Sequence, residues 1–465
     1  MLDQTRTPIL RAPLPTASRP AGRVLRRVAW CEPAEAFVVA RRVAPSGLSF
    51  LDSADAPGPR SRWSYLALDP ELRLVAEDPS EAPARLAALA GWLAERARPP
   101  DPAAPPFTGG AVGLIGYDAA CALHGLRSRH PSGELPALHV GLYDRVIAFD
   151  RLAREVWIAA PDRAAAGWLE ALLEDARGSV TEPASVDRLD WTAVTTPARH
   201  RAAVAEIVEA IAAGALFQAN YTTAHRAPRP PGLDLTALYL RLRGSLAAPF
   251  SAFVDLGGVG ETARALLSAS PERFLRLDAD GRVEARPIKG TAARLSDPRA
   301  DAAAAAALAA SDKDRAENLM IVDLMRNDLA RVARIGSVRV PQLNAVESFA
   351  AVHHLVSCVT AELAPGCGAV DLLRACLPGG SITGAPKRAA MQLIDRVENR
   401  ARDAYCGSVV RIGDDGAMDS SIVIRSLGVG EHWLGADAGG GITAGSDPQA
   451  EYDEAQLKLA RLIAP

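Results

Sequence analysis

The hydrophobic positions of this chain follow two spacings, one typical of helices and one typical of strands. Leu86, Leu89 and Leu93 are three and four residues apart, which predicts an amphipathic helix over 82–96. Between Val28 and about Asp52, β-branched and aromatic residues are frequent, which predicts strands. Further helices are predicted at 164–176, 200–214, 299–310, 311–334, 368–376, 386–397 and 448–463. Strands are predicted at 107–118 (a pair), 143–150, 155–160, 216–222, 250–256, 265–270, 274–277 and 282–286. Because the two kinds of element do not alternate regularly, we expect an α+β fold.

Composition changes along the chain and suggests how it is divided. Residues 1–25 are rich in proline and arginine without the apolar core of a signal peptide, so we expect a disordered tail. A polar linker, 177–198, then separates an N-terminal region, 26–180, from a C-terminal region, 195–465. Most of the candidate chemistry falls in the second region.

Charge and cysteine content exclude several classes of function. The 465 residues carry a formal net charge of −3, which does not favour nucleic-acid or membrane-surface binding. No apolar run reaches the roughly 18 residues that a membrane-spanning helix needs. The six cysteines form no Cys-x-x-Cys pair, so we expect free thiols and a cytoplasmic protein.

A single lysine stands out from the basic residues. The chain has only four lysines and otherwise uses arginine, and Lys289 follows a predicted strand in the stretch Pro287–Thr291. A lysine amine can lose its proton and act as a nucleophile or base, whereas arginine stays charged. From the stretch alone, a reactive amine and a surface charge are both open.

Three glutamates lie where carboxylates could act together. Glu317 precedes the apolar positions of its predicted helix, so it needs a partner such as a metal ion or Arg326. Glu451 and Glu454 share one face of the last helix with Lys458. Two or three carboxylates suit Mg²⁺, although a Glu/Glu/Lys face can also be simply solvated.

Two glycine clusters have the form of anion sites. Backbone N–H groups of Gly439–Gly441 could bind an anion or could form a tight turn. The loop Pro378–Lys387 leads into a predicted helix, whose N-terminus favours a carboxylate or phosphate. Neither cluster has Walker or dinucleotide spacing.

Taken in order, these motifs resemble those of the chorismate-utilising enzymes, over essentially everything after His200. The matching stretches are Phe217-Gln218-x-Asn220, Ser268 to Phe274, Pro287 to Thr291, Ala316 to Met320, Arg326 to Asp328, His354 to Ser357, Gly384 to Lys387, Ile424 to Ser426 and Asp447-Pro448-x-x-Glu451-Tyr452-x-Glu454. The resemblance implies the fold of anthranilate synthase component I: antiparallel sheets sandwiched by helices, in α/β/β/α layers. It also implies chorismate as the substrate and Mg²⁺ as the cofactor.

Site roles follow from the same resemblance, residue by residue. The implied Mg²⁺ ligands are Glu317, Glu451 and Glu454. The implied substrate-binding residues are Arg425, Tyr405, Gly440, Gly441, Lys458 and Thr291. The implied catalytic residues are Lys289, Glu272, His354 and Ser381, with Glu272 a candidate proton donor for the leaving hydroxyl.

Two positions indicate the branch of the family. Isochorismate and salicylate synthases carry a water-activating lysine where this chain has Gln218, and anthranilate synthases carry alanine where it has Lys289. The chain therefore resembles the aminodeoxychorismate synthases, in which a lysine adds covalently to ring carbon 2 and ammonia then enters at carbon 4. Anthranilate synthesis and a catalytically silent chorismate-binding or scaffolding subunit are the alternatives.

The resemblance also implies a partner. No cysteine lies in the Gly-aliphatic-Cys-x-Gly elbow of a glutaminase; Cys367, between two glycines, lacks that spacing. We therefore expect a separate glutamine amidotransferase subunit to supply ammonia, for 4-aminobenzoate and folate synthesis.

Overall fold

The computed structural model describes residues 23–179, 188–349 and 352–463. Most of the expected tail, 1–25, and part of the linker lie outside these ranges. The described part of the chain begins at Arg23, slightly before the expected boundary. The Arg23 guanidinium lies 2.7 Å from Asp144 and 2.9 Å from Asp414, and the first strand begins at Val24.

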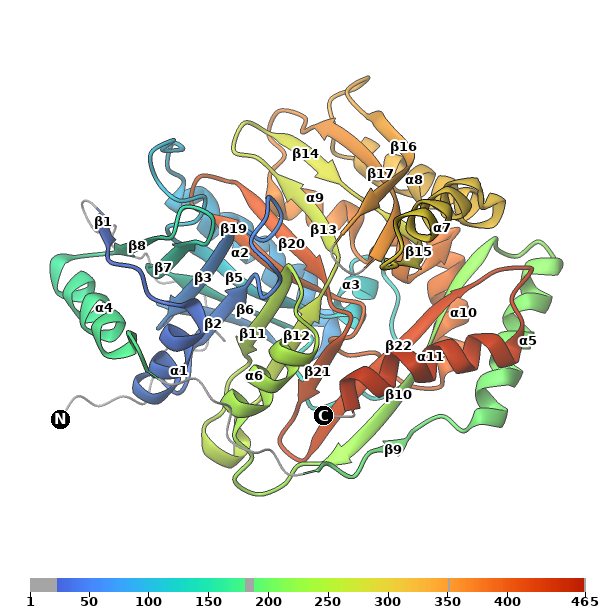
Figure 1. Ribbon diagram of the computed structural model, residues 1–465, viewed down its shortest axis with the longest axis horizontal. Helices are drawn as coiled ribbons and strands as arrows, with labels where there is room; N and C mark the ends of the chain where they lie inside the picture. Colours follow the sequence, from blue (N-terminus) through green and yellow to red (C-terminus); the bar gives the residue numbers. More distant parts are fainter. Residues whose placement is uncertain (1–22, 180–187, 350–351, 464–465) are drawn as a thin grey trace.

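Two antiparallel sheets form the centre of the described structure (Figure 1). The first, of twelve strands, runs in the order β1 (Val24–Val28), β8 (Glu155–Ala160), β7 (Arg145–Asp150), β3 (Trp63–Leu68), β2 (Leu48–Asp52), β11 (Phe250–Asp255), β12 (Ala265–Ser270), β21 (Ser426–Val429), β22 (Trp433–Ile442), β10 (Gln218–Pro228) and β18 (Gly384–Ala385), with β9 (Thr192–Ala193) beside β10. The second, of ten strands, runs β15 (Ile288–Ala293), β17 (Val352–Glu362), β14 (Arg282–Ala285), β13 (Arg273–Leu277), β20 (Met418–Ile422), β19 (Ser408–Gly413), β5 (Gly110–Ile115), β6 (Leu138–Tyr143) and β4 (Leu72–Ala76), with β16 (Arg339–Ser348) beside β17. Each sheet contains strands from both predicted regions.

Helices cover the outer faces of both sheets. They are α1 (Pro33–Val43), α2 (Ala82–Arg96), α3 (Tyr117–Ala122), α4 (Arg163–Ala176), α5 (Pro197–Ala212), α6 (Leu235–Ser245), α7 (Pro298–Ala310), α8 (Asp312–Ala330), α9 (Ala369–Cys376), α10 (Lys387–Glu398) and α11 (Pro448–Ile463). One hydrophobic core joins α1, α4, α6 and α11 to the first sheet, and another joins α2, α8 and α9 to the second. A third lies between the sheets, where Leu114 and Val254 are buried. The α+β prediction and its α/β/β/α layers are confirmed.

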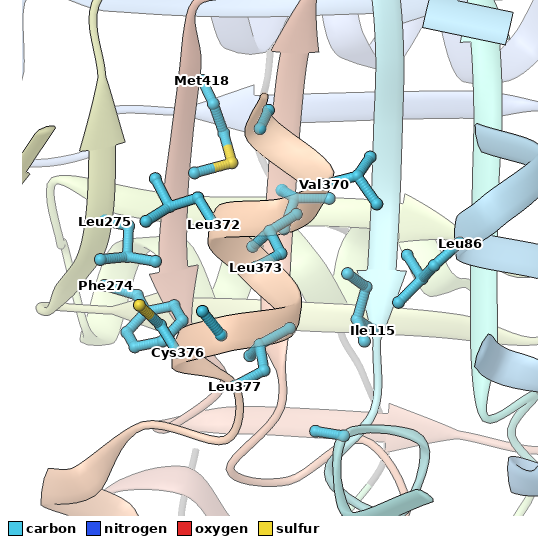
Figure 2. Close-up of a cluster of buried hydrophobic side chains, with 14 of the residues drawn as sticks. Leu86, Ile115, Phe274, Leu275, Val370, Leu372, Leu373, Cys376, Leu377 and Met418 are labelled. Carbon is cyan, nitrogen blue, oxygen red and sulfur yellow. The ribbon is translucent and has the colours of Figure 1, made fainter. Parts of the chain in front are cut away.

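Helix α9 shows how the second sheet is covered (Figure 2). Its apolar side chains, among them Leu372 and Leu373, point into a cluster with Phe274, Leu275 and Met418 of the sheet. Leu372 and Leu373 are fully buried. Replacing a buried leucine of this kind with alanine typically costs about 2–5 kcal/mol, so this packing holds the sheet in place beneath the site.

The strand prediction around Phe37 is wrong, because residues 33–43 form helix α1. Pro33 stands in its first turn with Glu35, and Arg41 and Arg42 lie in its last turn, where basic side chains complement the helix dipole. Ala36, Phe37 and Ala40 are completely buried on one face. These signals and the packing outweigh the weak strand preference of Val38 and Val39.

The glycine-rich stretch 107–118 contains one strand, β5, rather than the predicted pair. A Cβ atom on Gly113 would lie 2.0 Å from the carbonyl oxygen of His139 on the neighbouring strand. Glycine is therefore required here for close backbone packing. The chain turns into α3 at Tyr117.

Other elements agree with the predictions in part, whereas α6, β16, β17 and the four strands from β19 to β22 were not predicted. Helices α2 and α11 have the predicted bounds, and the hairpin of β7 and β8 is present. Among the described residues, no helix is both long enough and apolar enough to cross a membrane.

Candidate active site

Lys289 lies at a bulge in β15, at one end of the second sheet. Its register with β17 shifts between Lys289 and Thr291, and Gly290 between them has φ +73°. Such a bulge re-aims the side chains beside it. The Lys289 ammonium lies 3.7 Å from Glu317 on α8, and both side chains are 15% exposed. Lys289 is therefore a largely enclosed amine and not a surface charge.

The first sheet meets this amine through β10 and β22. In Figure 1, β15 and α8 lie above β22 and α11 on the right of the molecule. A Cβ atom on Gly441 would lie 3.1 Å from Lys289 Nζ and 3.0 Å from Gln218 Nε2. Gln218 is fully buried, and neither polar atom of its side chain has a hydrogen-bond partner in the described parts of the chain. A buried amide without partners is costly, which favours a ligand at this point.

Glu272 stands where the chain crosses from the first sheet to the second, between β12 and β13. Ser381 Oγ donates a hydrogen bond to its carboxylate at 3.3 Å. Burial raises the pKa of Glu272 to about 7, although Lys289 and the Ser381 hydrogen bond oppose the rise. Glu272 can therefore hold a proton near neutral pH and give it up, as a general acid must.

His354 and Thr291 face each other across β17 and β15. Thr291 Oγ1 lies 2.9 Å from His354 Nδ1. Burial lowers the pKa of His354, against the effect of a hydrogen bond with the Gly290 backbone. The neutral imidazole is thus the favoured form at neutral pH.

The carboxylates of α11 meet the first sheet at Gly440. A Cβ atom there would lie 3.1 Å from Glu451 Oε2, 4.0 Å from Glu454 Oε1 and 3.9 Å from Lys458 Nζ. Lys458 pairs with Glu454 at 2.6 Å and donates to the Gly439 carbonyl at 2.8 Å. The two glutamates and Lys458 therefore lie against the strand that carries Gly439 and Gly440, although the Glu454 side chain remains 56% exposed.

Neighbouring charges shift the pKa values of Glu451 and Glu454 in opposite directions. Burial raises the pKa of Glu451, and the nearby Glu454 carboxylate raises it further. Burial also opposes ionisation of Glu454, but Lys458, Lys313 and Lys289 together hold its pKa below the usual value. The sequence motifs did not single out Lys313, an exposed residue in the first turn of α8 whose charge helps to lower the Glu454 pKa.

The predicted Mg²⁺ ligands are not gathered into one cluster. No three acidic, histidine or cysteine side chains in residues 23–179, 188–349 and 352–463 are placed to hold a metal ion. Glu317 pairs with Lys289, Glu454 with Lys458, and Glu451 accepts a hydrogen bond from Ser446 at 2.7 Å. The donor set nevertheless fits Mg²⁺: these are carboxylates on facing elements, and the repulsion between Glu451 and Glu454 would be relieved by a divalent cation.

Arg425 lies where the chain crosses from β20 of the second sheet to β21 of the first, and Tyr405 lies shortly before the start of β19. Arg425 has φ +53°, which is uncommon for a non-glycine residue, and its guanidinium donates to the Lys458 carbonyl at 3.3 Å. Burial lowers the Arg425 pKa, and the Tyr405 phenol opposes this change. Burial raises the Tyr405 pKa well above its ordinary value, so the phenol remains a hydrogen-bond donor.

Two alternatives from the sequence are wrong. Glu317 does not pair with Arg326, which instead lies 3.0 Å from Asp323. Gly439–Gly441 form no turn, because they belong to β22 and pair with β10. The loop 378–387 does lead into the N-terminus of α10, and it carries Ser381 toward Glu272.

Comparison with known proteins identifies the family. A family model described as chorismate binding enzyme matches residues 50–464. The chain belongs to the chorismate-binding enzyme family. Aminodeoxychorismate synthase component 1 of Klebsiella aerogenes is 44% identical over 365 residues, which cover 77% of each chain. Anthranilate synthase component 1 of Streptomyces coelicolor is 36% identical over 435 residues, 89% of this chain and 82% of the relative.

A solved structure agrees with the fold of this chorismate-binding enzyme. Anthranilate synthase component I from Streptococcus pneumoniae superposes with a TM-score of 0.74 at 27% identity, covering 88% of this chain and 93% of the other. The family resemblance read from the motifs is confirmed, and with it the enzyme class.

Proposed function

We propose that this chorismate-binding enzyme converts chorismate and ammonia into 4-amino-4-deoxychorismate and water through a covalent adduct on Lys289. The observation that carries the proposal is the position of the Lys289 amine. It is enclosed between the Glu317 carboxylate and the wall formed by Gln218 and Gly441. A nucleophilic amine in that place supports addition to the ring.

In the first half of the reaction, neutral Lys289 attacks ring carbon 2. The two ring double bonds shift, and the carbon-4 hydroxyl leaves as water after it accepts a proton. Glu272 is the proposed donor because its raised pKa, about 7, keeps it partly protonated at neutral pH. The attack leaves a positive charge on the lysine nitrogen, which then loses one proton and becomes neutral. We assign Ser381 and His354 to the same part of the ring, beside Glu272 and Thr291 respectively.

In the second half, ammonia attacks carbon 4, the double bonds shift back and the bond from carbon 2 to Lys289 breaks. The lysine recovers a proton and the ammonia nitrogen loses one, so the sum is chorismate plus ammonia to 4-amino-4-deoxychorismate plus water. Gln218 supports ammonia over water as the nucleophile, because an amide cannot remove a proton from water as a lysine can.

Mg²⁺ is the proposed cofactor, held by Glu317, Glu451 and Glu454. When bound, it would neutralise the ring carboxylate and so ease the addition of the Lys289 amine to the ring. Around it, Lys458 supports the same carboxylate. We assign Arg425 and Tyr405 as the cation and the phenolic donor for the enolpyruvyl carboxylate, and the Gly440 and Gly441 backbone to the same carboxylate. Both ends of the substrate are thus oriented.

The nitrogen source is proposed to be a glutamine amidotransferase partner, with free ammonia as a substitute. Five of the six cysteines are buried. Burial raises the pKa of Cys31 and of Cys406 to about 12, so neither is an activated thiolate. These cysteines do not supply the nucleophile that glutamine hydrolysis needs.

Anthranilate synthase activity is the second candidate, because relatives with that name share the fold and much of the sequence. One experiment separates the two. The protein is incubated with chorismate, Mg²⁺ and ammonium, and the product is identified by mass and by its conversion to 4-aminobenzoate with a lyase. We expect 4-amino-4-deoxychorismate; anthranilate as the main product would refute the proposal, and no turnover would favour a silent binding subunit.

A further inference from the structure

A buried ion pair lies behind the site, away from the residues assigned to substrate or metal. Arg402, 1% exposed, contacts Glu398 through Nε at 2.9 Å and Nη2 at 2.6 Å. Glu398 ends α10, and its side chain has no exposed surface. The Arg402 guanidinium also lies 4.5 Å from the ring centre of Tyr117. Both charges are therefore withdrawn from solvent completely.

The guanidinium binds two backbone carbonyls that carry site residues. Arg402 Nη1 donates to Ile382, the neighbour of Ser381, at 2.9 Å. Arg402 Nη2 donates to Asn220, two residues beyond Gln218, at 2.5 Å. One planar side chain thus fixes the distance between the Ser381 loop and the Gln218 strand.

Two more contacts extend the connection. Glu398 Oε1 accepts hydrogen bonds from the backbone N–H and the hydroxyl of Thr222, each at 2.8 Å, further along β10. The Tyr405 N–H donates to the Arg402 carbonyl at 3.0 Å. The pair therefore joins α10, β10, the Ser381 loop and the turn that presents Tyr405.

Stability alone is a weak reason for this arrangement. Removing two charges from water is expensive, and apolar residues of similar volume often replace a buried pair without loss of stability. What an apolar pair cannot do is bind the carbonyls of Ile382 and Asn220 at set distances. The rigid fork of arginine does so.

We propose that Arg402 and Glu398 are a positioning pair that sets Ser381, Gln218 and Tyr405 against the Lys289 amine. The inference rests on the proposed function and adds to it a support outside the substrate contacts. Without the pair, the Ser381 loop loses its connection to β10, and the 3.3 Å hydrogen bond from Ser381 to Glu272 is the first catalytic contact affected.

The test uses the Arg402→Met/Glu398→Leu double variant, which leaves no unpaired buried charge. With saturating ammonium and Mg²⁺, we expect kcat to fall at least tenfold while the chorismate KM changes less than threefold. Arg425, Lys458 and the Mg²⁺ that the carboxylates of α8 and α11 would hold bind the substrate without contacting the pair, which is why KM changes little. An Arg396→Met variant, on the exposed face of α10, is the matched control and should behave as the wild type.

The pH dependence of kcat/KM is a second measurement, and a general loosening of the fold would not shift it. Ser381 and Lys289 both hold the Glu272 pKa down, so losing the Ser381 hydrogen bond moves the alkaline limb of kcat/KM to higher pH. The double variant and Ser381→Ala should show the same shift, and combining them should add nothing. Wild-type kcat in the double variant overturns the inference, as does a parallel change of kcat and KM with an unmoved limb.

A conservative variant keeps the test decisive if the double variant does not fold. Arg402→Lys retains the charge opposite Glu398 but cannot reach both carbonyls, so it should show the same kcat loss and limb shift. Arg402→Lys with wild-type kinetics overturns the inference. The wild-type product is identified first: anthranilate as that product refutes the proposed function, whereas the ratios of variant to wild-type kcat decide the role of the pair.

Discussion

Replacing Glu272 with glutamine separates what this carboxyl does for catalysis from what it costs the fold. Burial raises its pKa from 4.5 to about 7, which means that the folded protein disfavours the charged form. That interval corresponds to about 3 kcal/mol of folding free energy. Glutamine has nearly the same shape, can still accept from Ser381 and carries no charge.

The sign of the stability effect depends on pH. Above about pH 7, Glu272 is ionised in both the folded and the unfolded states, and the folded state bears the full cost of burying the charge. As pH falls from 7 to 4.5, the folded protein takes up a proton before the unfolded chain does, and the cost disappears. We therefore expect Glu272→Gln to be up to about 3 kcal/mol more stable than the wild type at pH 8 and nearly equal to it at pH 5.

Unfolding midpoints in urea and heat at both pH values measure this difference, and Glu174→Gln on the exposed side of α4 is the control. Turnover should move the other way, falling by about 10²–10⁴ because the proton donor is lost. A variant that is no more stable than the wild type at pH 8 would show that Glu272 is not a strained, partly protonated acid. A variant with wild-type turnover would remove it from the mechanism.

Substitutions at three further positions test the site itself. Lys289→Ala should lose the covalent adduct that protein mass spectrometry detects, yet regain turnover with saturating ammonium, which can occupy the vacated space. Lys289→Arg should not be rescued by ammonium. An adduct that survives in either variant would show that another residue is the nucleophile. Gly441→Ala places a methyl group 3.1 Å from Lys289 Nζ and 3.0 Å from Gln218 Nε2. Steady-state assays should therefore show kcat lowered about tenfold with an unchanged melting temperature. An unchanged kcat would mean that Gly441 and Gln218 do not lie at the reacting atoms. Glu454→Gln should raise the Mg²⁺ concentration needed for half-maximal activity about tenfold or more, and an unaltered Mg²⁺ titration would exclude it as a ligand.

Local signals predicted the elements well wherever they agreed with the packing. The bounds of α2 and α11 follow from their apolar spacing and, for α11, from Asp447, whose carboxylate caps the first turn by accepting from Gln449 and Ala450. Helix α1 was missed because Phe37 and its valine neighbours look strand-like in isolation. What decides their conformation is a core built from segments far away in the sequence.

The candidate site shows the same limit. Family motifs identified Glu272, Lys289 and Ser381, and the structure brings these three together. Motif spacing could not show that Gln218 is buried without a partner, because that depends on the strands on either side of it. Nor could it show that Arg402 binds two distant carbonyls, because a buried arginine has no local signature in a chain so rich in arginine.

The interleaving of early and late strands has a consequence for synthesis of the protein on the ribosome. Phe50 of β2 pairs with Phe253 of β11, and Val112 of β5 pairs with Arg411 of β19. At about 5–20 residues per second, the first strands wait on the order of ten seconds or more for their partners to be translated. During that interval they expose unpaired sheet edges, which are prone to aggregation. The nascent chain should therefore depend on chaperones, and fragments cut between residues 180 and 195 should fold only when both are present.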